Sequence, residues 1–224
     1  MNSPNGTKAA RMANTSKSLA RGVVGACLLA ALSCATKAAP PAAVTAPPPE
    51  DARQYYPLEL GWRWAYDVQR GNEQILAVYS VRARHGSSVE LQAGAEVITY
   101  EVLPEGIARS RSPGMGETEK RAPSTDYILR SPIRVGSRWP INDGEASITA
   151  VGQTITVPAG TFTNCVTVQE SRDAPLRLVR TTYAPGVGPV SLDSLAQIPG
   201  GQNYESTLRA SLRGVNRPGE DPLR

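Results

Sequence analysis

The fold is decided by the stretch Trp62-Arg63-Trp64-Ala65-Tyr66-Asp67-Val68, in which large apolar side chains alternate with other residues. A period of two places successive side chains on opposite faces of a β-strand, so one face of this segment is apolar and the other is polar. The same alternation recurs in residues 97–102, 145–150 and 204–213. This pattern is typical of antiparallel sheets that pack one face and leave the other in water.

Seven further strand candidates are separated by turn signals. The candidates are residues 75–84, 88–93, 107–110, 155–157, 162–170, 176–183 and 187–192. The turn signals are Arg70-Gly71-Asn72, His85-Gly86, Pro104-Glu105-Gly106, Asn142-Asp143-Gly144, Pro158-Ala159-Gly160, Pro185-Gly186 and Pro199-Gly200-Gly201. Connections this short favour antiparallel pairing. The sequence therefore predicts one all-β domain over residues 54–213, a single curved antiparallel sheet of roughly ten strands that forms a half-barrel or open barrel. Residues 214–224 are expected to be a polar tail.

Residues 1–33 are typical of a secretory signal peptide. Four basic residues and no acidic one precede an apolar run over residues 23–32. That run is too short for a membrane-spanning helix, which needs about 20 residues, and suits the apolar core of a signal peptide. It ends in Ala31-Leu32-Ser33-Cys34, which resembles the bacterial lipobox, although that family prefers Leu where Ala31 stands. The resemblance implies cleavage before Cys34 and its acylation by chains such as palmitate. Whether translation starts at Met1 or Met12 stays open.

The three cysteines have different expected fates. Cys27 is a rival cleavage site, but only five residues separate it from Arg21, too few for an apolar core. Cys34 would carry the lipid. Cys165 then remains alone and cannot form an intramolecular disulfide.

The net charge belongs to the signal peptide. The chain has 24 basic and 20 acidic residues, and removal of residues 1–33 leaves 20 of each. The basic isoelectric point therefore gives no reason to expect a nucleic-acid partner. Ala35, rather than Asp, follows Cys34, and by resemblance to enterobacterial lipoproteins this favours the outer membrane over the inner one. Residues 34–53 are rich in Pro and Ala and predict a semi-rigid tether between the anchor and the domain.

Three phrases of the sequence resemble a known group. They are Tyr55-Tyr56-Pro57-Leu58-Glu59-Leu60-Gly61-Trp62-Arg63-Trp64-Ala65-Tyr66, Val157-Pro158-Ala159-Gly160-Thr161-Phe162-Thr163-Asn164-Cys165 and Tyr183-Ala184-Pro185-Gly186-Val187-Gly188-Pro189-Val190. In this order they resemble uncharacterised bacterial exported proteins and lipoproteins related to TapB-type domains. The resemblance implies an open, strongly curved antiparallel sheet, similar to that of LolA-like lipoprotein carriers. The group has no agreed activity, so it transfers no functional residue.

The candidate ligand-binding residues are aromatic. Trp62, Trp64 and Tyr66 lie on one face of a strand, where they either fill the core or line an apolar binding site. His85, the only histidine, precedes a turn glycine, and no Gly-x-Ser-x-Gly motif accompanies it, so we expect no catalytic residue. Cys165 shares its parity with Thr163 and is expected to face away from the main core unless a bulge intervenes. One histidine and one free thiol predict no metal site and no cofactor.

The sequence favours a non-enzymatic envelope lipoprotein that binds an apolar ligand or an envelope protein. A structural or assembly component of an envelope or secretion complex is the alternative, and a hydrolase is disfavoured. Neither the specific partner nor the oligomeric state follows from the sequence.

The lipid anchor is directly testable. Cys34→Ala should release the protein from the membrane fraction and abolish labelling with a radioactive or clickable fatty acid, because the acylated thiol is lost. Cys27→Ala is the control and should change neither result. Release by Cys27→Ala instead would place the cleavage site at Cys27.

Overall fold

The computed structural model describes residues 47–110, 126–173, 176–198 and 203–220. The predicted signal peptide, Cys34 and most of the predicted tether lie outside these residues. So do the turn signal at residues 199–201 and the end of the polar tail.

The described residues form twelve strands in one sheet. The strands are β1 (Arg63–Arg70), β2 (Glu73–His85), β3 (Ser88–Ala93), β4 (Glu96–Leu103), β5 (Gly106–Ser110), β6 (Asp126–Arg130), β7 (Arg138–Ile141), β8 (Gly144–Val157), β9 (Gly160–Asp173), β10 (Leu176–Ala184), β11 (Gly188–Gln197) and β12 (Tyr204–Asn216). A short 3₁₀ turn, η1 (Ala52–Gln54), precedes them, and no α-helix occurs among the described residues. The all-β prediction is confirmed.

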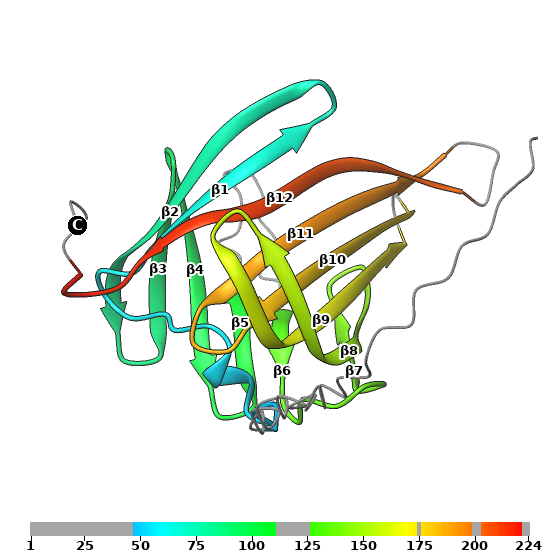
Figure 1. Ribbon diagram of the computed structural model, residues 1–224. Coiled ribbons are helices and arrows are strands. Elements are labelled where there is room, and N and C mark those ends of the chain that lie inside the picture. The colour runs from blue at the N-terminus through cyan, green and yellow to red at the C-terminus, as the bar shows by residue number, and fades with distance from the viewer. Residues whose placement is uncertain (1–46, 111–125, 174–175, 199–202, 221–224) are drawn as a thin grey trace, which may run out of the picture. The chain divides into compact units, whose positions relative to one another are not determined.

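The strands pair antiparallel in the order β6-β5-β4-β3-β2-β1-β12-β11-β10-β9-β8-β7. Strands that are neighbours in the chain pair with each other except β6 and β7, and β12 returns to pair with β1. The two edges of the sheet are thus consecutive in the chain. Figure 1 shows the sheet curving strongly, which brings these edges toward each other.

Side chains join the two edges. The indole Nε1 of Trp139 on β7 donates a hydrogen bond of 2.7 Å to the carbonyl oxygen of Tyr127 on β6. The carboxylate of Asp126 accepts a 2.7 Å hydrogen bond from the backbone N–H of Asn142. Pro140 lies on β7 and has no N–H to donate, which suits a strand at the edge of a sheet. The sheet is therefore nearly closed without a continuous ladder between β6 and β7.

Two strands were not predicted, and two predicted segments are one strand. Strands β6 and β7 are short, and β7 contains Pro140, so neither shows a clear alternation of apolar and polar residues. The segments predicted at 145–150 and 155–157 belong to β8, which continues through Gly152 with shifts of register against β9. Bulges interrupt the period of two without ending the strand. The count therefore rises from roughly ten to twelve.

The segment before β1 packs against the sheet. The backbone N–H of Ile133 donates to the carbonyl oxygen of Glu50 at 3.0 Å, and that of Gly186 donates to Gln54 at 2.7 Å. Glu50 belongs to the predicted tether, so the last residues of that tether contact the sheet. Figure 1 shows this segment at one end of the curved sheet.

Trp64 is the centre of the buried core. Its side chain is fully buried, and its indole Nε1 donates a 2.6 Å hydrogen bond to the carbonyl oxygen of Val187. The ring of Trp62 stacks on it at 5.6 Å between centroids, and the ring of Tyr56 meets it edge-on at 5.4 Å. Edge-on and offset stacked pairs are the favoured arrangements of aromatic rings. The apolar side of β1 is therefore packed by the segment that precedes it.

The chain continues beyond the expected end of the domain. Strand β12 runs to Asn216, past residue 213. The guanidinium of Arg217 then lies 5.8 Å from the ring centroid of Trp62. The first residues of the predicted polar tail thus lie against the start of β1.

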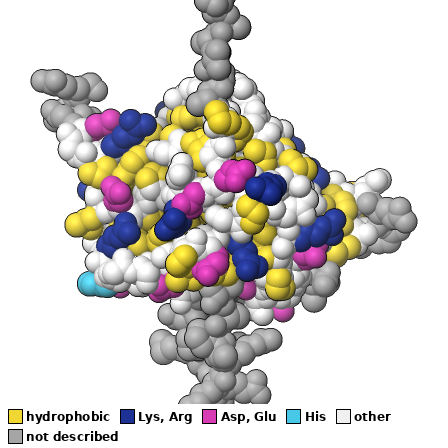
Figure 2. Space-filling view, turned by 90° about the horizontal axis from the view of Figure 1, so that it is seen from below, with side chains coloured by type: hydrophobic (Ala, Val, Ile, Leu, Met, Phe, Trp, Pro, Cys, Tyr) yellow, Lys and Arg dark blue, Asp and Glu magenta, His cyan; other side chains and the backbone are white. Residues whose placement is uncertain are grey.

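The exterior carries charges of both signs. Figure 2 shows basic and acidic side chains intermixed with apolar ones over the face seen from below. Several outer charges are paired, such as Arg213 with Asp67 at 2.9 Å and Arg138 with Glu145 at 2.9 Å. Exposed pairs of this kind contribute about 0–1 kcal/mol each, so the core rather than the surface stabilises the fold.

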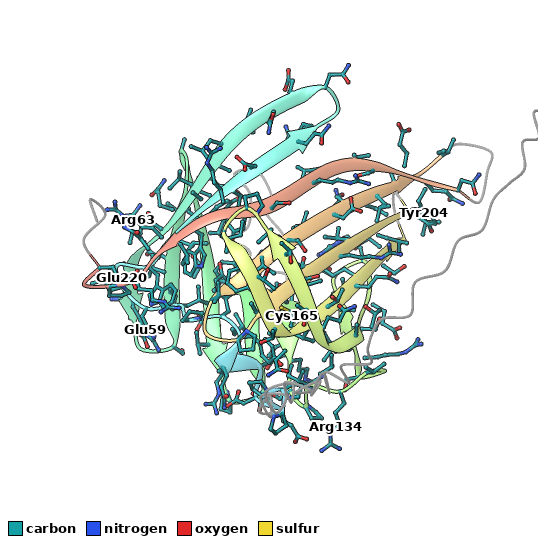
Figure 3. The ribbon with its side chains drawn as sticks, viewed as in Figure 1. Glu59, Arg63, Arg134, Cys165, Tyr204 and Glu220 are labelled. Atoms are coloured by element: carbon teal, nitrogen blue, oxygen red, sulfur yellow. The ribbon has the colours of Figure 1, made fainter. Side chains whose placement is uncertain are left out.

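Replacement of Trp64 by alanine should destabilise the domain strongly. Truncating a buried tryptophan costs about 3–5 kcal/mol, a large part of the roughly 5–15 kcal/mol that stabilises a typical domain. Arg63→Ala is the matched control because Arg63 is exposed (Figure 3), and its loss should cost no more than about 0.5 kcal/mol. Urea melts of both variants measure the difference, and equal losses would contradict the assigned facing of β1.

Candidate ligand-binding cavity

The concave face of the sheet encloses a cavity of about 350 Å³. Small-molecule sites in proteins usually measure about 300–1,000 Å³. Strands β1–β6 and β9–β12 line the cavity together with Tyr56 from the segment before β1. Two lining residues, Arg109 and Arg177, are exposed, so solvent reaches the interior.

Tyrosines form a large part of the lining. They are Tyr56, Tyr66, Tyr79, Tyr100 and Tyr183. The rings of Tyr56 and Tyr100 meet edge-on at 5.9 Å, and those of Tyr66 and Tyr79 meet edge-on at 5.5 Å. The hydroxyl of Tyr66 donates a 2.9 Å hydrogen bond to the carbonyl oxygen of Pro189. These contacts fix the rings of Tyr56, Tyr66, Tyr79 and Tyr100 at the cavity.

One wall of the cavity is aliphatic. It consists of Val68 on β1, Leu91 on β3, Ile98 on β4, and Leu208 and Ala210 on β12. These strands follow one another in the order β4-β3-β2-β1-β12, with Tyr79 on β2 between the aliphatic residues of β3 and β1. Such a surface binds hydrocarbon through the burial of apolar area.

The wall formed by β9–β11 carries charged and hydroxyl groups beside the apolar side chains of Val179 and Leu192. Strand β9 contributes Glu170 and Arg172, whose side chains form an ion pair of 2.5 Å. Arg172 also donates to the carbonyl oxygen of Asn142 at 3.2 Å. Both charged side chains are only about 15% exposed, so the pair is held by neighbouring structure rather than free in water. Thr181, Ser191 and Ser194 add hydroxyl groups to this wall.

Two further cations face the cavity. The guanidinium of Arg109 on β5 lies 5.9 Å from the ring centroid of Tyr100. The pKa of Arg109 is raised above its ordinary value, chiefly by Tyr100 and also by Glu170. Arg177 on β10 lines the same cavity. Neither arginine forms an ion pair with a carboxylate among the described residues.

The structure separates the three aromatic residues singled out from the sequence. Tyr66 lines the cavity, whereas Trp62 and Trp64 are buried in the core beside it. The role of these residues in binding stays a prediction. Four charged residues of the cavity were not predicted from the sequence: Arg109, Glu170, Arg172 and Arg177. The signal available for Arg177 was the alternation of residues 177, 179, 181 and 183 in β10, which line the cavity together.

Cys165 is buried in the core, and a bulge explains why. Asn164 has a φ of 57°, and the register of β9 against β8 shifts at this point. The bulge turns Cys165 inward, where its side chain is fully buried and its Sγ lies 3.4 Å from the carbonyl oxygen of Phe162. The prediction that Cys165 faces away from the core is therefore wrong. The exception stated with that prediction, a bulge in the strand, is confirmed. Figure 3 shows Cys165 among the strands, and its burial raises the pKa of the thiol.

His85 lies outside the cavity. It is exposed at the end of β2, where it pairs with Ser88 across the turn. Among the described residues, no group of three or more His, Cys, Asp or Glu side chains is placed to hold a metal ion. No helix in this part of the chain is long and apolar enough to cross a membrane.

The buried tyrosines predict a loss of stability at high pH. Burial raises the pKa of Tyr56, Tyr66 and Tyr183 well above 10, the value of a free phenol. The folded state therefore keeps phenolic protons that the unfolded chain releases, and the resulting stabilisation is present below about pH 10 and is lost as the pH rises further. Urea melts at pH 8, 9.5 and 11 should show a falling free energy of unfolding, and Tyr56→Phe should weaken this dependence. Reversible ionisation of all tyrosines near pH 10, without loss of structure, would contradict the buried placement.

Comparison with known proteins finds no family model and no curated protein that matches the chain. Two solved structures resemble it. A candidate exported protein with a YmcC-like fold from Bacteroides fragilis NCTC 9343 has 16% identity and a TM-score of 0.42, over 73% of this chain and 99% of that chain. A candidate lipoprotein from Parabacteroides distasonis ATCC 8503 has 14% identity and a TM-score of 0.37, over 72% of this chain and 98% of that chain. These likenesses are too distant to transfer a function, and the resemblance to TapB-type and LolA-like proteins stays a prediction.

Proposed function

We propose that the chain is a lipid-anchored protein of the bacterial cell envelope that binds an apolar ligand inside its curved sheet and catalyses no reaction. The observation that carries this proposal is the cavity of about 350 Å³ that solvent reaches and aromatic and aliphatic side chains line. The lipobox-like sequence at Cys34 supports the anchor, and Ala35 supports the outer membrane. The three phrases that resemble TapB-type and LolA-like envelope proteins also support a location in the cell envelope.

The side chains at the cavity support binding rather than catalysis. Its charged residues are Arg109, Arg172, Arg177 and Glu170, and the only carboxylate of this set is paired with Arg172. A nucleophile and a neighbouring base would be needed for covalent catalysis. Hydroxyl groups such as those of Ser191 and Ser194 do line the cavity, but His85 and Cys165 lie on different strands and outside its lining.

A second candidate function rests on the hairpin of β1 and β2. Leu76 and Val78 lie two residues apart on β2 and are 59% and 49% exposed, so they point to the same side of the strand. Figure 1 shows this hairpin extending beyond the neighbouring strands. Exposed apolar side chains on a projecting hairpin suit docking to an envelope protein, as the assembly alternative requires.

The cavity can be tested by filling it. Ala210→Trp places an indole on the aliphatic wall and should reduce binding of N-phenyl-1-naphthylamine, a neutral apolar fluorophore, at least tenfold. Arg209→Trp is the matched control, because Arg209 is the preceding residue on β12 and is exposed on the outer face. Fluorescence titration measures both, and circular dichroism verifies folding.

Two results would separate the candidate functions. Equal probe binding by both tryptophan variants and the unchanged protein would contradict ligand binding in the cavity. If the unchanged protein binds no probe and instead forms a stable complex that the double change Leu76→Ser and Val78→Ser abolishes, the assembly function is supported in its place.

A further inference from the structure

The cavity holds more positive than negative charge. Three arginines and one glutamate among the described residues line it. Glu170 and Arg172 neutralise each other at 2.5 Å. Among the described residues, neither Arg109 nor Arg177 has a carboxylate within 4.0 Å, whereas six ion pairs form outside the cavity. The described lining of the cavity therefore has a net charge of +2, although Glu170 also attracts Arg109 and Asp126 lines a smaller hollow beside it.

Arg109 is placed to receive an anion. Its guanidinium contacts the ring of Tyr100 and retains most of its five N–H donors. A cleft with walls of low polarity focuses the field of the charges inside it, which raises the local concentration of anions. Guanidinium groups bind carboxylates and phosphates with two parallel hydrogen bonds, so an anionic group of either kind fits this position.

The polarity of the lining is divided between two sides. Strands β1, β3, β4 and β12 supply Val68, Leu91, Ile98, Leu208 and Ala210. Strands β5, β9 and β10 supply the charged residues, and Ile128, Val179 and Leu192 add apolar side chains on that side. A second, smaller hollow is lined jointly by Arg109, Asp126, Glu170 and Arg172, which shows that the charged ends of β5 and β9 meet across the lumen beside the β6–β7 edges. A ligand that satisfies both sides must be apolar at one end and anionic at the other.

We propose that the ligand is a single-chain anionic amphiphile, with its carboxylate or phosphate held by Arg109 and Arg177 and its hydrocarbon chain against the aliphatic wall. This inference rests on the proposed function, because it names the class of ligand for the same cavity. The volume of about 350 Å³ lies at the lower end of the range for ligand sites and suits one hydrocarbon chain better than two.

The test compares ligands that differ only in their head group. Palmitate, lysophosphatidate with a palmitoyl chain, and neutral monopalmitoylglycerol are each titrated against the protein filled with N-phenyl-1-naphthylamine, below their aggregation concentrations. The unchanged protein should bind at least one of the two anions ten times more tightly than the neutral compound. Tighter binding of palmitate identifies a carboxylate ligand, and tighter binding of lysophosphatidate identifies a phosphate ligand.

The arginines are tested by neutralising them. The double change Arg109→Gln and Arg177→Gln should weaken binding of the preferred anion at least tenfold and leave the affinity for monopalmitoylglycerol within twofold. Arg180→Gln is the matched control, because Arg180 lies on the exposed face of β10 and is absent from the cavity lining. This control should leave both affinities unchanged.

The possible failures are distinguishable. If the unchanged protein binds the fluorophore and all three amphiphiles equally, the cavity binds apolar ligands without recognising an anion, and this inference is wrong while the proposed function stands. Equal loss of anion binding in Arg180→Gln and in the double variant would also overturn it. If neither the fluorophore nor any amphiphile binds, the proposed function itself fails.

Discussion

The contact between Trp64 and the turn before β11 is the constraint on which the rest of the structure depends. The indole N–H of Trp64 bonds to the carbonyl oxygen of Val187, which is 123 residues away in the chain. Gly188 follows at a φ of 107°, and a Cβ there would lie only 2.9 Å from the ring of Tyr56. A side chain at this position would therefore push Tyr56 off the core. Packing around Trp64 therefore holds strand β1 against both the segment before it and the turn after β10.

This junction explains why one part of the sheet is filled and another is hollow. A sheet of twelve strands encloses more space on its concave face than the inward side chains of its own strands fill. The aromatic rings of Tyr56, Trp62 and Trp64 fill that space where the segment before β1 crosses it. No equivalent segment among the described residues fills the space beyond Tyr66, and the cavity lies there. The aromatic packing around Trp64 thus both stabilises the fold and sets where the cavity begins.

The sequence predicted the fold well and the site poorly, for a physical reason. Alternation along a strand is a local property, so long strands such as β1, β2 and β12 were recognisable, whereas short β6 and Pro-containing β7 were not. Alternation predicts the facing of a side chain only where the strand is regular. Asn164 has a left-handed backbone conformation, and the side chain of Cys165 after it lies in the core instead of facing away from it. The polar side of the cavity depends on which strands face each other across the lumen. Arg109 and Arg177 are 68 positions apart, and the sequence alone gave no register that would bring them to one cavity.

The unpaired edges of the sheet also account for where polar groups gather. Without a ladder between β6 and β7, backbone groups at these edges need other partners, and Asp126, Trp139 and Arg172 supply hydrogen bonds there. Because an unsatisfied polar group in an apolar lumen is costly, charged side chains concentrate on this side, where Ile128 and Val179 also line the cavity. The Glu170–Arg172 pair belongs to this structural requirement, since Arg172 bonds to the backbone after β7. Arg109 and Arg177 satisfy no such group among the described contacts. Closure of the sheet thus accounts for the Glu170–Arg172 pair. It does not account for Arg109 and Arg177, and the proposed binding of an anion gives these two arginines a role.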